Sequence, residues 1–252
     1  MSPETPTPAT ALSDDDIHQQ LIEAIVDQRL LPGTKLVEDR LGQAFGVSRT
    51  RIRQVLIRLA QEQVVTILPN KGASIAQPTV DEAREVFEAR TVIESVLVRY
   101  FVARARQDDL RALAECIEAE EAARKAGDHV KALRQSGRFH LLLAQAARHQ
   151  TFEQFLRKLV SRTSLILMSY GAAERERPVR QAEPVRWVQS CRCEDHRQLL
   201  GALKAAMRGK ASADEAVGLM SSHLQHIEAG LCFNEPQAPA DPLWAALHPA
   251  RR

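Results

Sequence analysis

Four arginines crowd one short segment of the chain. They are Arg49, Arg51, Arg53 and Arg58, and they alternate with the apolar residues Ile52, Val55, Leu56 and Leu59. The apolar residues follow the i, i+3, i+4, i+7 spacing of a helix that buries one face. A guanidinium can donate two parallel hydrogen bonds to a guanine edge or a phosphate, so arginines on the opposite face favour a helix that enters the major groove of DNA. The alternative is a charged face that merely meets water.

The segments before this helix support the DNA-binding interpretation. Apolar spacing predicts a first helix over residues 17–26, and Leu31-Pro32-Gly33 is a turn that follows it. A short second helix is closed by Gly46, and Ser48 is a suitable N-cap for the arginine-rich helix.

A β-hairpin is predicted directly after the arginine-rich helix. Val64–Leu68 is rich in β-branched residues, 69–72 is a Pro-Asn-Lys-Gly turn, and Ala73–Ala76 can pair back. Lys71 then lies at the tip of a wing, close to phosphates. Helix, turn, helix and hairpin in this order predict a winged helix-turn-helix, which is far more specific than the arginines alone.

The rest of the chain predicts a second, all-helical domain, so the fold class is mainly α. Gln77-Pro78-Thr79 marks the boundary, and six helical patterns follow, starting near Thr79 and near residues 107, 129, 150, 187 and 212. The stretch from Gly171 to Arg186 holds two prolines and cannot be one regular helix. We predict a disordered tail over 1–13, a winged helix-turn-helix over 14–77, a six-helix domain over 78–232 and a second disordered tail over 233–252.

Composition limits the function classes. The 252 residues carry a net charge of only +2, so affinity for nucleic acid must come from a local basic surface. No apolar run is long enough for a membrane span, and the first residues lack the pattern of a secretory signal. Four cysteines in a chain of this length imply no disulfide framework, and we expect a cytoplasmic protein.

Two smaller patterns in the helical part leave alternatives open. Cys191 and Cys193 precede His196 and could bind metal or sense redox state, but their spacing fits no standard zinc site, which favours two free thiols. Arg90 and Glu94 are one helical turn apart. They could form a surface-type ion pair, or Arg90 could face a cavity and bind an acidic effector.

The N-terminal part resembles the GntR superfamily of bacterial transcription regulators. The similarity is carried by Leu31-Pro32-Gly33, Leu41, the run Gly46-Val47-Ser48-Arg49-Thr50, Arg53, Leu56, Leu59 and Lys71-Gly72-Ala73. The resemblance implies DNA contacts from Ser48, Arg49, Thr50 and Arg53, with Arg51 beside them and Lys71 and Gly72 at the wing. Arg51 stands where the family usually has proline, and Asp39 where some members have a DNA-contacting arginine.

The helical part resembles the FadR-like branch, whose second domain is an FCD-type ligand-binding domain. The segments that carry this similarity are Arg90–Glu94, Arg138–His140, Glu194–His196 and His223-Leu224. The resemblance implies that His140, His196 and His223 hold a divalent metal, with Zn²⁺ or Ni²⁺ suited to imidazole ligands. Ser136 replaces the aspartate that usually joins the three histidines. His226, one turn after His223, is a further neighbour.

The resemblance also implies partners. We expect a homodimer that binds a short inverted repeat in double-stranded DNA, acts as a repressor, and responds to a small organic acid. A metal-dependent enzyme is one alternative, yet the sequence holds no HExxH motif, phosphate-binding loop or nucleophile elbow and offers no catalytic residues. A non-specific architectural DNA binder is another, and it would have no need for a long helical domain.

Overall fold

The first helix begins three residues earlier in the chain than the apolar spacing predicted. A computed structural model describes residues 12–171 and 193–233, and in it α1 spans Asp14–Val26. Ser13 caps this helix in a reciprocal capping box with Asp16. Leu12 packs against the neighbouring core. Leu12 and Ser13 therefore belong to the folded domain, although we had assigned them to the tail.

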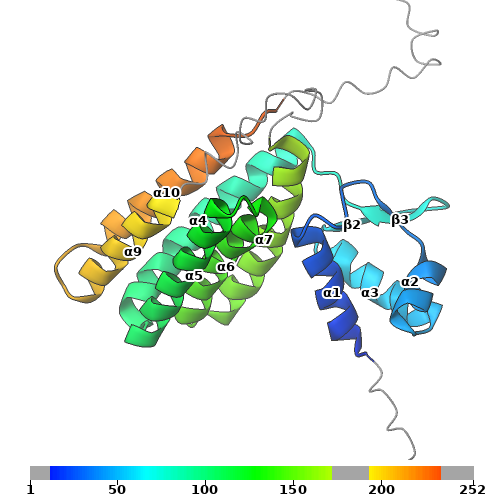
Figure 1. The fold of residues 1–252 in the computed structure, drawn as a ribbon, viewed down its shortest axis with the longest axis horizontal. Helices are drawn as coiled ribbons and strands as arrows, with labels where there is room; N and C mark the ends of the chain where they lie inside the picture. Colours follow the sequence, from blue (N-terminus) through cyan, green and yellow to red (C-terminus); the bar gives the residue numbers. More distant parts are fainter. Residues whose placement is uncertain (1–11, 172–192, 234–252) are drawn as a thin grey trace, which may run out of the picture.

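The second and third helices form the predicted helix-turn-helix (Figure 1). They are α2, Glu38–Phe45, and α3, Arg49–Gln61. Gly46 ends α2 in the left-handed conformation, and Ser48 caps α3 by accepting from the Arg51 amide. A Cβ on Gly42 would lie 2.9 Å from the Val47 carbonyl oxygen, so glycine permits the close approach of the two helices. The predicted stripe is buried: Ile52, Val55, Leu56 and Leu59.

The predicted two-stranded wing is present, and a third, short strand from before α2 adds to its sheet. β2, Val65–Leu68, pairs antiparallel with β3, Gly72–Ile75, in the register Val65 to Ile75. β1, Lys35–Leu36, pairs with the other edge of β3, giving the order β1-β3-β2. A strand of two residues is too short to produce an alternating pattern, so the sequence carried no signal for it.

Six described helices build the second domain, as predicted. They are α4 (Val80–Arg104), α5 (Gln107–Lys125), α6 (His129–Ala146), α7 (Gln150–Tyr170), α9 (Cys193–Met207) and α10 (Ala213–Ala229). Thr79 caps α4 in a capping box with Glu82. The proline-containing stretch that we expected to interrupt the helices, and the predicted start of α9 near 187, lie outside the described residues. None of the described helices combines the length and apolarity needed to cross a bilayer.

The core of the helical domain lies between long helices that run side by side (Figure 1). Its largest buried side chains include Leu97, Phe101, Leu113, Phe139 and Leu143. A smaller cluster near the end of α7 includes Tyr170, whose ring centroid lies 5.3 Å from that of Phe233. Phe233, which we had placed at the start of the C-terminal tail, therefore packs against the domain.

Helix α7 of the helical domain packs against the N-terminal domain. Leu165 is 1% exposed and belongs to the same apolar cluster as Ile17, Leu59 and Val64 of the N-terminal domain. Tyr170 Oη donates a 2.6 Å hydrogen bond to the carbonyl of Pro78, in the segment that connects the domains. The N-terminal domain thus completes its core with a side chain from the helical domain.

Candidate functional site

The arginine-rich face of α3 is exposed, as a reading surface requires. Arg49 has a side-chain exposure of 67%, and Ser48, Thr50 and Arg53 are also exposed. At the wing, Lys71 and Gly72 are exposed as well. The structure therefore leaves these predicted DNA-contacting residues accessible on α3 and at the tip of the hairpin.

Arg49 is held by acidic residues of the preceding helix. Its Nε donates to Glu38 Oε2 at 2.6 Å, and its Nη1 lies 3.7 Å from Asp39 Oδ2. These carboxylates raise the pKa of Arg49 above its usual value, with the Glu38 hydrogen bond as the main cause. Arg53, one turn further along α3, makes no comparable side-chain contact within the described part of the chain.

Two other arginines of α3 point to the start of α1 instead. Arg51 Nε donates to Asp14 Oδ1 at 2.7 Å, and its Nη2 donates to the Leu12 carbonyl at 2.7 Å. Arg58 pairs with Asp15. The acidic first turn of α1 is thus tied to α3 on a flank different from the one that carries Arg49 and Arg53.

Three histidines from three helices of the second domain meet in the interior. His140 of α6, His196 of α9 and His223 of α10 are each at most 1% exposed. One nitrogen from each ring lies within 4.8 Å of the others. The Nε2 atoms of His196 and His223 are 3.1 Å apart. The three residues that we predicted as metal ligands therefore come together in space.

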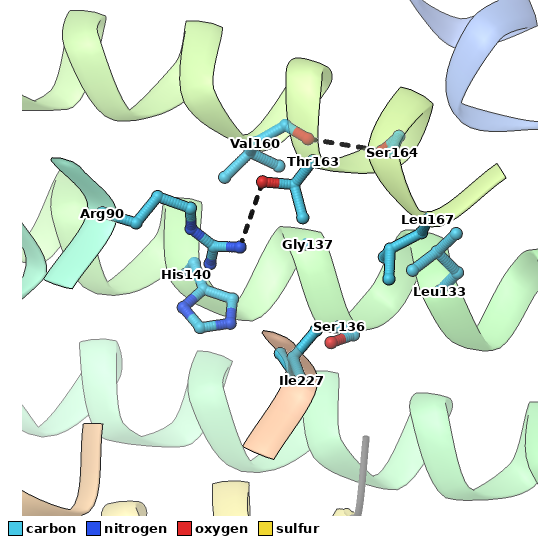
Figure 2. Close-up of a pocket in the computed structure, with 10 residues that line it drawn as sticks. All are labelled: Arg90, Leu133, Ser136, Gly137, His140, Val160, Thr163, Ser164, Leu167 and Ile227. Atoms are coloured by element: carbon cyan, nitrogen blue, oxygen red, sulfur yellow. Dashed lines mark hydrogen bonds between the residues drawn. The ribbon is translucent and has the colours of Figure 1, made fainter. Parts of the chain in front are cut away.

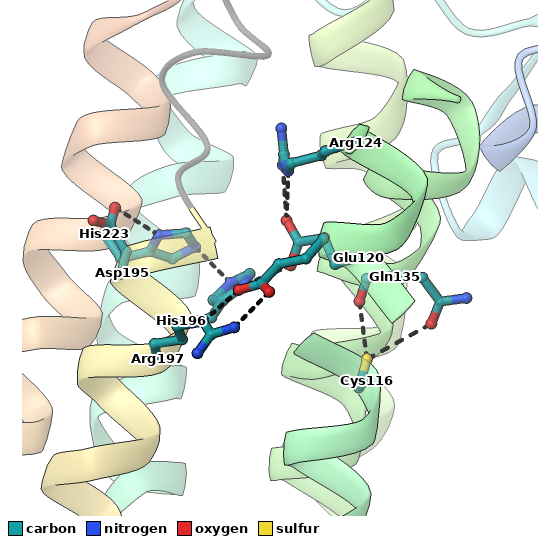
Figure 3. Close-up of polar contacts among 9 residues, drawn as sticks. Cys116, Glu120, Arg124, Gln135, Asp195, His196, Arg197 and His223 are labelled. Atoms are coloured by element: carbon teal, nitrogen blue, oxygen red, sulfur yellow. Dashed lines mark hydrogen bonds and ion pairs between the residues drawn. The ribbon is translucent and has the colours of Figure 1, made fainter. Parts of the chain in front are cut away.

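Each of these rings is bound at Nδ1 by its own carboxylate. Glu94 Oε2 lies 2.5 Å from His140 Nδ1, Glu120 Oε2 lies 2.8 Å from His196 Nδ1, and Asp195 Oδ2 lies 3.2 Å from His223 Nδ1. Figure 3 shows the last two contacts. A ring that donates its Nδ1 proton to a carboxylate presents a lone pair at Nε2, which is how metal-binding histidines are usually oriented.

Sequence reasoning missed the carboxylate partners as site residues. The sequence indicates Glu94 only as the i,i+4 partner of Arg90, and it carries no signal for Glu120. Glu120 is 76 residues from His196 along the chain, so no local spacing connects them. Only the packing of α5 against α9 brings the two together.

Burial sets the protonation of the cluster. It lowers the pKa of His140 to about 4 and, together with His196, lowers that of His223 to about 3. Burial alone would raise the pKa of Glu94, but the charges of Arg90 and His140 outweigh it and lower that pKa to about 2. Near neutral pH, His140 and His223 are therefore neutral and Glu94 is ionised.

A cavity of about 30 Å³ lies beside His140 (Figure 2). Arg90 reaches its wall, with Nε donating to Glu94 at 2.8 Å and Nη1 to Thr163 Oγ1 at 3.3 Å. Arg90 thus forms the i,i+4 ion pair in the interior rather than at the surface, and it also faces a cavity; binding of an acidic effector by Arg90 stays a prediction. Other lining residues are Leu133, Ser136, Gly137, Val160, Ser164, Leu167 and Ile227.

Two polar atoms at this cavity have no hydrogen-bond partner within the described residues. They are Nη2 of Arg90 and Nε2 of His140, both buried. Buried polar atoms are almost always satisfied, so an unsatisfied pair at a cavity points to a missing polar group. The cavity holds about two water molecules, so a larger ligand requires the lining side chains to move apart.

The remaining predicted candidates lie at the edge of the cluster. His226 is 63% exposed and shares Asp195 with His223 at 3.4 Å. Burial raises the pKa of the Cys193 thiol to about 11, so the thiol is protonated near neutral pH and suits the free-thiol interpretation. Cys191 lies outside the described residues.

Two protein-family models match the chain. The one described as "Bacterial regulatory proteins, gntR family" matches residues 14–75, and the one described as "FCD domain" matches residues 85–226. Together they cover both parts of the architecture. The first contains α3 and its arginines, and the second contains the three buried histidines.

Several curated bacterial proteins are similar to parts of the chain. An uncharacterized HTH-type transcriptional regulator of Bacillus subtilis, YdhC, is 25% identical over 140 residues, which is 55% of this chain and 62% of that protein. The HTH-type transcriptional repressor RspR of Escherichia coli is 29% identical over 99 residues, or 39% of this chain and 43% of that protein. The chain thus spans less than two thirds of the length of these relatives.

Two solved structures share the fold over most of the chain. Escherichia coli McbR has a TM-score of 0.72 at 20% identity, covering 86% of this chain and 96% of its own. A regulator from Rhodococcus sp. RHA1 has a TM-score of 0.68 at 21% identity, covering 86% and 95%. At such identities the similarity concerns the fold alone.

Proposed function

This chain belongs to the GntR family of bacterial regulatory proteins and carries an FCD domain, and from that premise we propose that a small carboxylate-bearing metabolite in the helical domain controls its affinity for DNA. The observation that carries the proposal is the pair of unsatisfied buried groups at the cavity, Arg90 Nη2 and His140 Nε2. A carboxylate can accept from the guanidinium, and the apolar side chains of Leu133, Val160 and Ile227 can contact a short carbon chain.

The proposed DNA interface is the exposed edge of α3 with the tip of the wing. Ser48, Arg49, Thr50 and Arg53 would contact DNA from α3, and Lys71 and Gly72 from the wing. Arg51 would contribute only if it left Asp14 and the Leu12 carbonyl. One such helix reads only a few base pairs, so we propose a homodimer on a short inverted repeat. Because the relative RspR is named a repressor, we propose repression as the mode of action.

We also propose a divalent metal, Zn²⁺ or Ni²⁺, on Nε2 of His140, His196 and His223. The donor set fits: His140 Nε2 lacks a hydrogen-bond partner among the described residues, and each Nδ1 is already bound by a carboxylate. Two Nε2 lone pairs 3.1 Å apart, as in His196 and His223, repel unless a proton or a cation lies between them. When bound, the metal would supply open coordination positions that accept a ligand carboxylate.

Ser136 distinguishes this site from one with an additional acidic ligand. It is buried, lines the cavity and lies four residues before His140 on α6. Its hydroxyl brings no negative charge, so the proposed site consists of three neutral ligands and leaves the positive charge of the metal to attract an anion. This arrangement favours a carboxylate effector over a neutral one.

Metal analysis tests the ligand set. The untagged chain, incubated with Zn²⁺ or Ni²⁺ and then dialysed, is expected to retain about one equivalent per chain, and His196→Ala less than a tenth. His226→Ala is the matched control, because it removes an exposed histidine one turn from His223, and it should retain the metal. Ser136→Asp should bind more tightly. Less than a tenth of an equivalent in the wild-type chain would contradict the metal proposal.

The control of DNA affinity is tested with an operator selected from a random duplex library. Operator affinity is measured with and without organic acids, sugar acids and fatty acyl compounds. An active ligand should shift it by roughly 5–150-fold, the usual range of coupling between sites. The shift should be lost in Arg90→Ala and kept in Arg84→Ala, which removes an exposed arginine from the same helix. A ligand that acts equally on Arg90→Ala would show that the effector site lies elsewhere.

A further inference from the structure

Arg49 differs from Arg51 and Arg58 of α3 in the helix that holds it, because its carboxylate partners lie on α2 and their closest ones lie on α1. Its Nε is occupied by Glu38 at 2.6 Å, while its side chain remains 67% exposed. Glu38 is the first residue of α2 and is only 24% exposed, so the carboxylate is the fixed partner and the guanidinium extends from it towards solvent. We propose that Glu38 is a positioning residue that presents Arg49 to a guanine, and that Glu38 and Asp39 together determine sequence specificity.

The geometry of the pair restricts which donors DNA can meet. With Nε bound to Glu38, the two terminal nitrogens of Arg49 are the donors that remain for a partner. Two parallel N–H groups match the O6 and N7 acceptors of guanine in the major groove. The helices that carry the pair pack closely, because Gly42 of α2 lies directly against the Val47 backbone that precedes α3. Glu38 therefore limits the conformations of the free Arg49 side chain, so Arg49 loses less conformational entropy when it binds DNA.

The two carboxylates also discriminate between a base and a phosphate. Asp39 Oδ2 lies 3.7 Å from Arg49 Nη1 and its side chain is 66% exposed. A phosphate that approaches Arg49 is repelled by both negative charges, whereas a guanine edge carries no net charge. Repulsion of the wrong partner is a common source of specificity. The acidic pair thus weakens attachment to any DNA backbone more than it weakens attachment to the correct base.

The other arginine pairs of α3 supply the matched control. Asp15 pairs with Arg58 and is 82% exposed, but it sits on α1 rather than on the helix-turn-helix. Asp15→Asn removes the same single negative charge from an arginine of the same helix. It should raise general DNA affinity only slightly and leave the base preference unchanged.

The experiment is selection of bound sequences from a random duplex library with the full chain. It is run on wild type, Glu38→Ala, Glu38→Gln, Asp39→Asn and Asp15→Asn. Wild type and Asp15→Asn should enrich the same motif. Glu38→Ala should lose the preference at one guanine per half-site, and its affinity ratio for selected over scrambled duplex should fall about tenfold, within the range of one bidentate base contact. Asp39→Asn should keep the motif but bind scrambled duplex more tightly.

The outcomes separate this inference from the proposed DNA interface on which it rests. If wild type enriches no motif, the proposed operator binding fails, and the role of Glu38 fails with it. If wild type enriches a motif and Glu38→Ala enriches the same one with the same affinity ratio, only the role of Glu38 is overturned. Circular dichroism shows whether Glu38→Ala folds. If it does not fold, the isosteric Glu38→Gln is used instead. The inference is overturned if the affinity ratio of Glu38→Gln for selected over scrambled duplex equals that of Asp15→Asn.

Discussion

Replacing Arg49 and Arg53 together by alanine is expected to weaken binding to the selected operator by roughly 2–6 kcal/mol, or at least about thirtyfold. Each arginine that contacts a base in bidentate fashion contributes roughly 1–3 kcal/mol, and the two lie one turn apart on the exposed face of α3. Fluorescence anisotropy with a labelled operator, over a series of salt concentrations, measures the change. Lys71→Ala should instead lower the salt dependence by about one phosphate contact.

The double variant needs a control that removes the same charge elsewhere. Arg111 and Arg157 are both exposed and lie on the helical domain, where each pairs with an acidic residue of its own helix. Their replacement by alanine should leave operator affinity within about twofold of wild type, since they are remote from the proposed interface. If both double variants bind like wild type, α3 is not the reading helix.

Replacing Glu94 by glutamine is expected to lower the free energy of unfolding by about 3–5 kcal/mol. Glu94 is completely buried and bridges Arg90 and His140, so a neutral side chain leaves the Arg90 guanidinium buried without its counter-charge. Breaking a buried ion pair from one side has this cost. The pKa of Glu94 agrees: a fall from 4.5 to about 2 corresponds to about 3 kcal/mol. Urea denaturation of chelator-treated protein measures the difference.

The pH dependence of that difference has a definite sign. The folded pKa of Glu94 lies below its unfolded value, so its ionised form stabilises the fold fully above about pH 4.5. This stabilisation is lost as pH falls from about 4.5 through about 2, and below that pH wild type and Glu94→Gln both carry a neutral side chain. The gap between the two proteins should therefore close across that window.

Glu121→Gln is the control for the buried position. Glu121 pairs with Arg197 at the surface, where the arginine side chain is 55% exposed, and such pairs contribute about 1 kcal/mol or less. If Glu94→Gln costs no more than Glu121→Gln, the buried network does not stabilise the domain as described.

The fold could be predicted from the sequence wherever its signals are local. The apolar stripe of α3, its Ser48 cap and the glycine after α2 act within one or two turns, and the structure has all three. The long helices of the second domain follow for the same reason. The two-residue strand β1 was missed because its pairing with β3 connects residues about forty positions apart.

The candidate site was predicted only in part. The residues that were missed are the carboxylates, because no local spacing in the sequence connects them to the histidines. The three histidines were found through family resemblance, yet the carboxylates that orient them lie on other helices. Glu94 is 46 residues from His140, and Glu120 is 76 residues from His196. Similarly, the Glu38–Arg49 pair depends on the angle between α2 and α3, which composition does not reveal. Contacts of this kind require the packed structure.

Leu165 indicates that the stability of the N-terminal domain depends on the helical domain. This side chain of the helical domain fills the core beneath α1 and α3. Removing a buried leucine typically costs about 2–5 kcal/mol, a large share of the roughly 5–15 kcal/mol that holds a typical domain folded. A fragment that ends at Pro78 would lack this residue and expose the surface that it covers. We therefore expect the two halves of this chain to unfold together, and its N-terminal domain to be less stable when it is separated from α7.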